Sequence, residues 1–336
     1  MNIISAYTDF KFLGGAEKVC LQLARELNNS NEIPLVLTTT PLSEIHFDYT
    51  KDKKYQFIDI TFAALLKLQN GSVILSHHRK ITTVLVVFSF FLCKHFKIIH
   101  IAHTTFNNYR YLTLFPRHIV AVSNAVKNNL IRYFKVHPNS ITVIYNGLKD
   151  EYIPDFSLEK RERDCVKVII PARIEQVKKQ IEFFKYTKNQ LSEHITIYFA
   201  GDGPLFKVLK DIIGDSSQYI LLGHIKMMQQ LYAFDYVSLF SEKEGLPTAL
   251  IEGCMFNKPL ITNALDSVME INIDKYNGYV AKSYTELISL LNNIPLPDSA
   301  TYKILSSNSR RHYTDKFTFK EMVTKYKSLI EFYTTG

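Results

Sequence analysis

Short apolar segments alternate with helical patterns along almost the whole sequence, and this alternation limits the fold more than any other feature. The strand-like segments of the first half are residues 2–7, 34–39, 55–60, 73–76, 97–103, 119–122 and 140–145. Those of the second half are residues 166–171, 195–200, 219–222, 237–240 and 259–262. Helical patterns, beginning with residues 17–28, fall between them. Such alternation is typical of parallel sheets with helices on both faces, so we expect an α/β protein.

The chain of 336 residues is long for a single hydrophobic core. Two domains of about 150 residues each are therefore expected. A polar stretch over residues 149–164 carries charges of both signs and one proline, which is typical of a linker. We predict an N-terminal domain over residues 1–150 and a C-terminal domain over residues 151–317. The last helix, over about residues 318–336, is expected to pack back on the first domain.

The excess of positive charge is confined to the first half of the chain. Residues 1–150 hold 17 Lys and Arg against 9 Asp and Glu, whereas the remainder holds 23 of each kind. A basic half can meet nucleic acid, an anionic lipid surface or a phosphorylated acceptor. Because no segment resembles a nucleic-acid-binding motif, we expect no nucleic-acid partner and favour the other two.

The helical segment over residues 80–96 is unusual because residues 81–92 carry no charge. It is too short to span a bilayer, which requires about 20 apolar residues. Two interpretations stay open: a helix buried beneath its neighbours, or a helix with one face in the membrane interface. The chain shows no signal-peptide pattern and its cysteines form no CxxC pair, so we expect a cytoplasmic protein. In the second interpretation it would be peripheral at the inner face of the cell membrane.

Residues 244–252, with the sequence Glu-Gly-Leu-Pro-Thr-Ala-Leu-Ile-Glu, say most about function. They follow an apolar run that reads as a buried strand, and a helix is predicted over residues 248–256. Gly245 permits a tight turn, Pro247 suits the start of a helix, and Thr248 can cap it. The N–H groups of residues 246–249 would then point toward an anion.

Two carboxylates flank that turn, because Glu244 precedes it and Glu252 lies one or two helical turns beyond it. Both can approach a ligand bound at the helix N-terminus. The pattern therefore suits a sugar nucleotide, with the diphosphate on the N–H groups and the hydroxyls on the carboxylates.

Further motifs occur in a fixed order along the chain. They are Gly14-Gly15-Ala16-Glu17-Lys18, Val122-Ser123-Asn124-Ala125, Tyr145-Asn146-Gly147, Pro171-Ala172-Arg173 with Lys178, Gly201-Asp202-Gly203-Pro204, Gly223-His224 and the Glu244…Glu252 segment. Together they resemble the family 4 retaining glycosyltransferases of the GT-B fold. The resemblance implies two Rossmann-like parallel-sheet domains facing across a cleft, the first binding the acceptor and the second the nucleotide sugar.

The resemblance also implies roles for individual residues. Arg173 and Lys178 resemble the pair that binds the donor diphosphate, Glu252 the acid that binds the ribose, and Glu244 the acid beside the transferred sugar. Two cations at the departing diphosphate would stabilise the transition state more than the ground state. Lys179 is an adjacent competitor for the lysine role. The expected donor-binding residues are Gly15, Arg173, Lys178, Gly203, His224, Gly245, Leu246, Pro247, Thr248 and Glu252.

The acceptor-side residues are expected in the first domain. Gly14 and Gly15 follow the first strand, where a backbone without Cβ lets a ligand approach, although a plain tight turn is the alternative. His103 resembles the family's histidine near the transferred sugar, and a satisfied structural histidine is its alternative. The expected catalytic residues are Glu244, His103, Arg173 and Lys178. The neighbouring histidines His77, His78 and His100 are interpreted as structural.

The sequence contains no Asp-x-Asp motif, which metal-dependent transferases of another fold use to hold a divalent ion. We therefore expect no metal and no cofactor, with a UDP- or GDP-sugar as donor substrate. The resemblance implies transfer with retention by front-face attack, in which no protein nucleophile takes part.

We thus predict a glycosyltransferase that moves a hexosyl unit to a glycan or lipid-linked acceptor in bacterial surface-polysaccharide biosynthesis. A nucleotide-sugar epimerase of the same fold is one alternative. A catalytically silent GT-B protein that stabilises an active partner is another. A dehydrogenase is disfavoured because no GxGxxG follows any strand.

Overall fold

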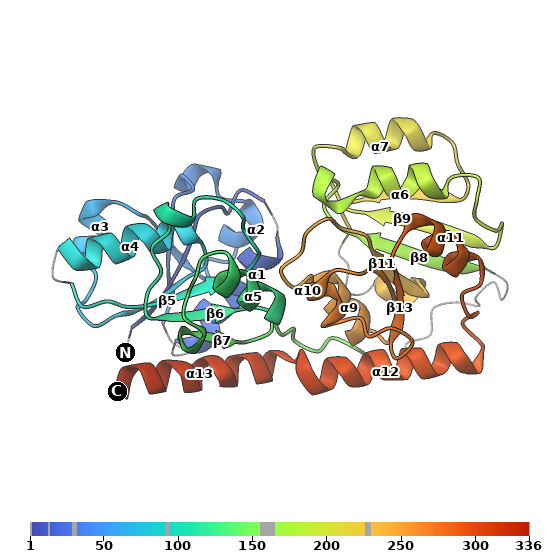
Figure 1. The fold of residues 1–336 in the computed structure, drawn as a ribbon. Helices are drawn as coiled ribbons and strands as arrows, with labels where there is room; N and C mark the ends of the chain where they lie inside the picture. The colour runs from blue at the N-terminus through green and yellow to red at the C-terminus, as the bar shows by residue number, and fades with distance from the viewer. Residues whose placement is uncertain are drawn as a thin grey trace. The chain divides into compact units, whose positions relative to one another are not determined.

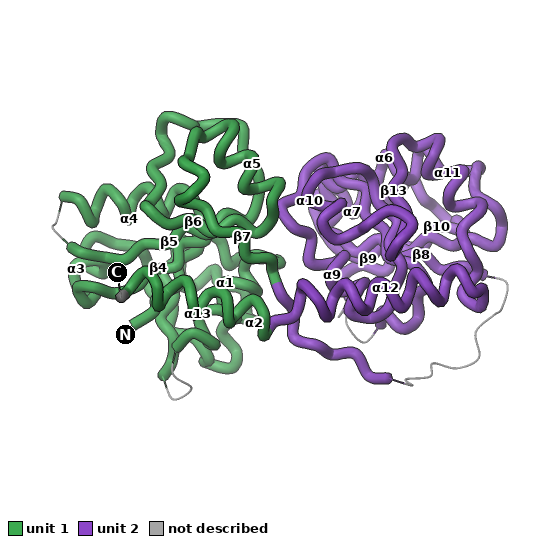
Figure 2. Tube along the Cα trace, turned by 60° about the horizontal axis from the view of Figure 1, so that its bottom comes forward, with its two compact units in different colours: residues 1–146, 320–336 green, residues 147–319 purple. Residues whose placement is uncertain are grey.

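The computed structural model describes residues 2–12, 14–28, 32–91, 94–154, 165–225 and 230–335 (Figure 1). The chain divides into two compact units (Figure 2). Unit 1 comprises Met1–Asn146 and Lys320–Gly336, and unit 2 comprises Gly147–Phe319. The division after Asn146 precedes the predicted linker, whose residues 155–164 lie outside the described residues.

Unit 1 is built on a seven-stranded parallel sheet with the order β3-β2-β1-β4-β5-β6-β7. The strands are β1 (Ile3–Tyr7), β2 (Leu35–Thr38), β3 (Gln56–Asp59), β4 (Val73–Ser76), β5 (Lys97–Ala102), β6 (His118–Ala121) and β7 (Ile141–Val143). The helices are α1 (Gly15–Leu27), α2 (Phe47–Thr50), α3 (Phe62–Lys67), α4 (Arg79–Phe91), α5 (Asn124–Arg132) and α13 (Phe319–Thr335). Short 3-10 turns are η1 (Leu42–Glu44), η2 (Arg110–Leu112) and η3 (Pro138–Ser140).

Both faces of the first sheet are covered. Leu65 of α3 and Leu85 of α4 pack with Ile4 and Ile74 in one buried cluster. A second buried cluster contains Leu21 of α1, Tyr49 of α2 and Val36 of β2. Helix α13 belongs to this unit, where Lys97 Nζ donates to the Thr334 carbonyl over 3.0 Å.

Unit 2 is built on a six-stranded parallel sheet with the order β10-β9-β8-β11-β12-β13. The strands are β8 (Val166–Pro171), β9 (Ile195–Ala200), β10 (Tyr219–Gly223), β11 (Tyr236–Leu239), β12 (Leu260–Asn263) and β13 (Gly278–Ala281). The helices are α6 (Gln180–Thr187), α7 (Phe206–Ile213), α9 (Thr248–Met255), α10 (Asp266–Met269), α11 (Tyr284–Asn292) and α12 (Ala300–Lys316). The 3-10 turns are η4 (Gln176–Lys178) and η5 (Leu231–Ala233).

Helices also lie on both faces of the second sheet. Phe183 of α6, Leu209 of α7 and Leu287 of α11 share one buried core, whereas α9 packs against α12 on the other face (Figure 1). In each sheet the strand order reverses once, between β1 and β4 in unit 1 and between β8 and β11 in unit 2. Open parallel sheets bind ligands at the carboxyl ends of the strands beside this switch point.

The structure confirms the predicted fold class, which is α/β with two Rossmann-like parallel sheets. Every predicted strand is present, with ends within two residues of those predicted. Strand β13 and helix α12 were not predicted. Strand β13 has only four residues and begins with a glycine, so it shows no clear alternation of apolar and polar residues. Helix α12 has few apolar side chains, so it shows no clear helical repeat of apolar residues.

Candidate functional site

The two loops beside the switch point of unit 2 are joined by an ion pair. Lys178 lies in η4, after β8, and Glu244 lies in the loop after β11. The Lys178 Nζ atom is 2.6 Å from Glu244 Oε1, and the two side chains are 20% and 8% exposed. The neighbouring parallel strands β8 and β11 explain the meeting, because their carboxyl ends lie at one edge of the sheet.

Arg173 is the first charged residue after β8, and its side chain is 47% exposed. Its Nε atom lies 4.0 Å from Glu175 Oε2. Gln180, which is only 2% exposed, fixes the backbone of this loop. Its side-chain amide donates to the Arg173 carbonyl over 2.9 Å. The loop is thus fixed while the guanidinium stays accessible to a ligand.

The loop after β9 packs so closely on this segment that two of its residues must be glycine. A Cβ on Gly201 would lie 2.1 Å from the Ala172 carbonyl oxygen, and one on Gly203 would lie 2.4 Å from that of Ile174. Both glycines have φ values, +152° and +158°, that other residues rarely adopt. The Ile174 N–H donates to the Asp202 carbonyl over 2.9 Å, which ties the two loops together.

Helix α9 starts directly after the Glu244 loop. Pro247 is its N-cap and supplies no side-chain hydrogen bond, so Thr248 is the first helical residue and not the cap that its sequence position favoured. Gly245, Leu246 and Pro247 are buried. The first N–H groups of a helix have no partner within it, so this end offers donors and a positive dipole to an anion.

Glu252 lies on the second turn of α9 and is 9% exposed. The Glu244 backbone is anchored by Ser267 of α10, whose hydroxyl donates to the Glu244 carbonyl over 2.9 Å. The loops after β11 and β12 are joined by Asn263, which donates to the Ser241 carbonyl over 2.7 Å. Cations, a helix N-terminus and two carboxylates therefore come from segments that end at the same edge of one sheet.

The structure distinguishes the two adjacent lysines. Lys179 has a left-handed backbone conformation, φ 54°, and its Nζ lies 3.0 Å from Glu242 Oε2 and 3.5 Å from Glu182 Oε1. Lys178 instead contacts Glu244, which lies in the segment that leads into α9. His224 follows β10 and is exposed, and residues 226–229 beyond it lie outside the described residues.

The acceptor-side residues predicted in unit 1 lie at the carboxyl edge of its sheet. Gly14 is the N-cap of α1 and Gly15 is its first residue. A Cβ on Gly14 would lie 2.3 Å from Glu17 Oε2, so the Glu17 carboxylate folds back over this glycine. The Gly14 backbone is extended, with φ −136°, and the Glu17 side chain can turn aside, so the close approach alone does not require a glycine at this position.

His103 is paired with a second histidine. His103 follows β5, His77 follows the adjacent strand β4, and His103 Nε2 is 2.8 Å from His77 Nδ1. Their rings lie 13° from parallel. Burial and the neighbouring His78 lower the pKa of His103 to about 4, and burial lowers the pKa of His77 well below its usual range. Both rings are therefore neutral at pH 7 and share one proton across the contact.

Sequence reasoning overlooked three of these residues. His77 was interpreted as structural, although its place after a strand next to that of His103 indicates a meeting at the sheet edge. Gln180 and Ser267 hold the two donor-side loops through backbone carbonyls. Such bonds leave no motif in the sequence. Within the described ranges, no three His, Cys, Asp or Glu side chains gather as metal ligands would.

Comparison with known proteins gives a family for each half. Residues 13–152 match the family model described as Glycosyltransferase Family 4, and residues 157–312 match the model described as Glycosyl transferases group 1. One curated relative, an uncharacterized glycosyltransferase of Methanocaldococcus jannaschii, is 26% identical over 147 residues. That match covers 39% of this chain and 39% of the relative, so the chain spans well under half of the relative's length in this alignment.

Solved structures share the fold over almost the full length. Anabaena HepE in complex with UDP is 15% identical, with a TM-score of 0.82 over 98% of this chain and 100% of that one. The lipopolysaccharide outer core galactosyltransferase WaaB is 15% identical, with a TM-score of 0.73 over 98% and 99% of the two chains. A glycosyltransferase of Rickettsia africae is 16% identical, with a TM-score of 0.77 over 99% and 98%. The family models and these GT-B folds together support a glycosyltransferase of the family 4, GT-B type.

Proposed function

We propose that the protein is a metal-independent, retaining glycosyltransferase that moves a hexosyl unit from a UDP- or GDP-sugar to a glycan or lipid-linked acceptor. The observation that carries the proposal is the contact between Lys178 and Glu244 at the switch point of unit 2. It joins a cation and a carboxylate beside the uncapped N-terminus of α9. A nucleotide sugar needs this combination, because its diphosphate is anionic and its sugar presents hydroxyls.

The donor would be held by its diphosphate and its ribose. The diphosphate would accept hydrogen bonds from Arg173, Lys178 and the first N–H groups of α9. Lys178 has three N–H donors and uses one for Glu244, so it can hold the carboxylate and a phosphate oxygen together. Glu252 would accept from the ribose hydroxyls. HepE in its complexes with UDP and with UDP-glucose favours the uracil nucleotide as the first to test.

The reaction breaks the bond between the anomeric carbon and the diphosphate oxygen and forms one to the acceptor oxygen on the same face. The acceptor hydroxyl passes its proton to the departing phosphate. Negative charge thus develops on the diphosphate, where Arg173, Lys178 and the helix dipole stabilise the transition state. The Glu244 carboxylate, held by Lys178, would steady the positive charge at the anomeric carbon without bonding to it.

The acceptor and biological setting are the finer part of the proposal. WaaB, by its name, acts on the lipopolysaccharide outer core, and a pneumococcal structural neighbour is an O-GlcNAc transferase bound to UDP and GlcNAc. The name of WaaB favours transfer to a bacterial glycan, and the pneumococcal neighbour favours a UDP-linked donor. The excess of Lys and Arg in residues 1–150 favours a phosphorylated or lipid-linked acceptor and attachment to the inner face of the membrane. None of the described helices is both long and apolar enough to cross a membrane.

Thermal shift with UDP, GDP and their sugar conjugates is the first test. A nucleotide at 100 times its dissociation constant should add about 2.7 kcal/mol to the free energy of unfolding. The preferred sugar nucleotide is then incubated with bacterial glycan acceptors, and the anomeric configuration of the product is determined by NMR.

Retention and unchanged turnover in EDTA are the expected results. Inversion would contradict the proposed mechanism. Loss of activity in EDTA with recovery in Mg²⁺ would contradict metal independence. Epimerised free nucleotide sugar without an acceptor would identify an epimerase, and failure to bind any nucleotide would favour a non-catalytic protein.

A further inference from the structure

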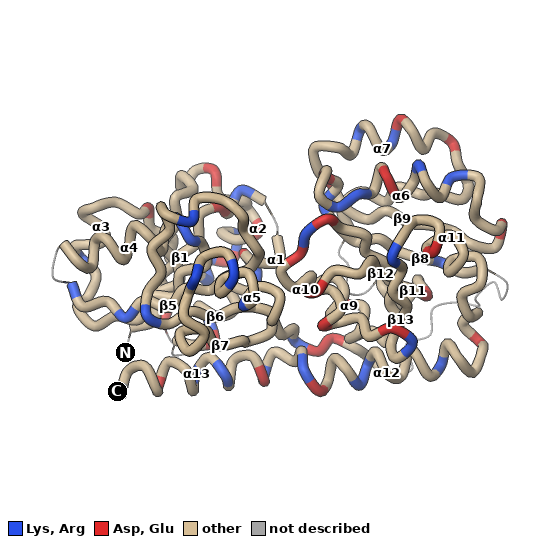
Figure 3. Tube along the Cα trace, viewed as in Figure 1, with Lys and Arg blue, Asp and Glu red and all other residues tan. Residues whose placement is uncertain are grey.

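A long part of unit 1 contains no acidic side chain. Residues 60–146 hold 10 Lys and Arg but no Asp or Glu, so the described part of this stretch carries no red in Figure 3. The stretch runs from α3 to the strand β7 and includes α4 and the loop after β5. Any anion that approaches this part of the chain therefore meets positive charge without local repulsion.

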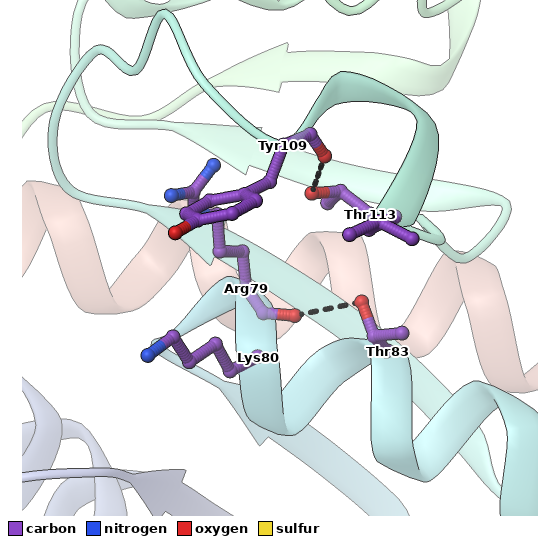
Figure 4. A pocket seen from close by; sticks show the side chains of 6 residues that line it. Arg79, Lys80, Thr83, Tyr109 and Thr113 are labelled. Atoms are coloured by element: carbon purple, nitrogen blue, oxygen red, sulfur yellow. Dashed lines mark hydrogen bonds between the residues drawn. The ribbon is translucent and has the colours of Figure 1, made fainter.

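A cavity of about 250 Å³ lies within this stretch, where α4 begins (Figure 4). It is lined by Arg79, Lys80, Thr83, Tyr109, Leu112 and Thr113. Two hydrogen bonds shape its walls: Thr83 donates to the Arg79 carbonyl over 3.0 Å, and Thr113 donates to the Tyr109 carbonyl over 2.9 Å. The Leu114 N–H donates to the Thr83 hydroxyl over 3.1 Å, which fixes the loop against the helix.

Arg79 is the buried charge of this cavity, with only 6% of its surface exposed. Its guanidinium donates to the carbonyl of Asn108 over 2.7 Å and to the side-chain oxygen of the same residue over 2.5 Å, and it lies 4.0 Å from the centroid of the Phe106 ring. Among the described residues, no carboxylate oxygen lies within 4.0 Å of it. Three of its five N–H donors remain for a ligand.

A buried cation without a counterion is costly, and burial lowers the pKa of Arg79 accordingly. Arginine nevertheless keeps its charge at neutral pH. An oxyanion that enters the cavity would supply the missing negative charge, and phosphate is an oxyanion that a guanidinium binds through paired hydrogen bonds.

An exposed apolar face continues from the cavity along α4. Lys80, Val84, Val87 and Phe91 follow one another at steps of four, three and four residues and therefore share one face of the helix. Val84, Val87 and Phe91 are 50%, 37% and 75% exposed, and the buried face of the same helix packs on the sheet. In the adjacent loop Leu112, which lines the cavity, is 72% exposed. Apolar side chains beside a cationic cavity suit an amphiphile whose polar end is anionic.

We propose that the Arg79 cavity binds a phosphate group of a lipid-linked acceptor, whose hydrocarbon lies on the exposed face of α4. This inference rests on the proposed function, because the bound lipid phosphate is an acceptor only if the protein is a glycosyltransferase. The position fits that role, because Arg79 follows β4 and therefore lies at the same edge of the first sheet as His77 and His103.

Vesicle binding by the full chain tests the proposal at low salt. The probes are vesicles of phosphatidylcholine alone and of an equimolar mixture of phosphatidylcholine and phosphatidylglycerol. We expect binding to the anionic vesicles only. Lys80→Ala should weaken it about five-fold, the effect of one cation near an anionic surface. Arg79→Met should weaken it about ten-fold or more, because a charge-assisted hydrogen bond is lost. Phe91→Ala should weaken it about ten-fold through loss of apolar insertion.

Lys67→Ala is the matched control, because Lys67 is an exposed cation of α3 in the same acid-free stretch but outside the cavity. An effect of Lys67→Ala equal to that of Lys80→Ala would overturn the proposal in favour of diffuse charge. So would the absence of vesicle binding. Stabilisation by inorganic pyrophosphate that depends on Arg79, without vesicle binding, would assign the cavity to a soluble phosphate instead.

Urea unfolding followed by circular dichroism shows whether each variant keeps unit 1 folded, and a UDP thermal shift shows whether it keeps the donor site. Because UDP is expected in unit 2, every correctly folded variant should keep the shift of the parent chain. If the parent chain binds anionic vesicles but neither UDP nor GDP, the proposed function is wrong, whereas the assignment of this surface to lipid binding is kept. If it binds nucleotide but no vesicle, only the present inference fails.

Discussion

The ammonium group of Lys178 lies 2.6 Å from a carboxylate oxygen of Glu244, although 66 positions separate the two residues in the sequence. The contact is largely shielded from water, since the Glu244 side chain is 8% exposed. Breaking a shielded pair by removing one partner leaves an uncompensated charge. Any test of Lys178 must therefore separate its expected catalytic effect from its effect on stability.

Replacing Lys178 by Ala should lower kcat/KM by about 10²–10³, which is the effect of losing one preorganised donor at the developing charge. Lys179→Ala is the control, since Lys179 pairs with the acids Glu182 and Glu242 and should change turnover little. The double variant Lys178→Met with Glu244→Gln should recover stability but not activity. Equal turnover of the two single variants would show that the wrong lysine, or the wrong reaction, has been proposed.

Glu252→Gln should weaken binding of the donor nucleotide about 10- to 100-fold, because hydrogen bonds to a charged group contribute about 1.5–3 kcal/mol. The amide keeps the shape of the acid at a position that is only 9% exposed. Calorimetric titration with UDP measures the change. Glu286→Gln, at the first turn of α11, is a control distant in sequence from the α9 segment. Unaltered UDP affinity in Glu252→Gln would remove this residue from the donor site.

The sequence predicts the fold well because buried parallel strands and their helices leave periodic apolar patterns. Strands β8 and β9 begin and end at the predicted residues. The failures are short or polar elements. Helix α12 carries Ser, Asn and Arg where an amphipathic helix would carry apolar residues, yet Tyr302, Leu305 and Tyr313 of this helix are buried. Tertiary packing decides such elements, and no local pattern reports it.

The candidate site is predictable only where a motif encodes it. Arg173, Lys178, Glu244 and Glu252 stand in recognisable segments, and the switch point of the sheet brings those segments to one edge. The pairing of His77 with His103 depends on the register of β4 against β5, in which Ser76 is opposite His100. Neither register nor the carbonyl contacts of buried amides can be read from one sequence.

Gly203→Ala should destabilise unit 2 and weaken donor binding together. Its φ of +158° disfavours an alanine, and the new Cβ would lie 2.4 Å from a backbone oxygen that cannot move without shifting the Arg173 loop. Together these should cost about 3 kcal/mol or more. Gly223→Ala is the control, because Gly223 also has a positive φ, +69°, but no close contact. Its new Cβ would lie 3.9 Å from the Phe206 ring, so we expect a loss of about 1–2 kcal/mol in the free energy of unfolding. Urea unfolding and UDP titration measure both variants, and equal stability losses would contradict the argument from close packing.

His103 should make the stability of unit 1 sensitive to acid. Its pKa is lowered to about 4 by burial and by His78, whereas an unfolded histidine titrates near 6.5. Between these values the unfolded chain binds a proton that the folded chain does not, so the free energy of unfolding falls as the pH falls. The slope from this residue alone should approach about 1.4 kcal/mol per pH unit and vanish below the folded pKa. His103→Gln should give a shallower decline than the parent chain in urea unfolding followed by circular dichroism. The slope is the readout, since the variant also alters the bond to His77 at every pH, and parallel pH profiles would show that His103 is not buried as a neutral ring.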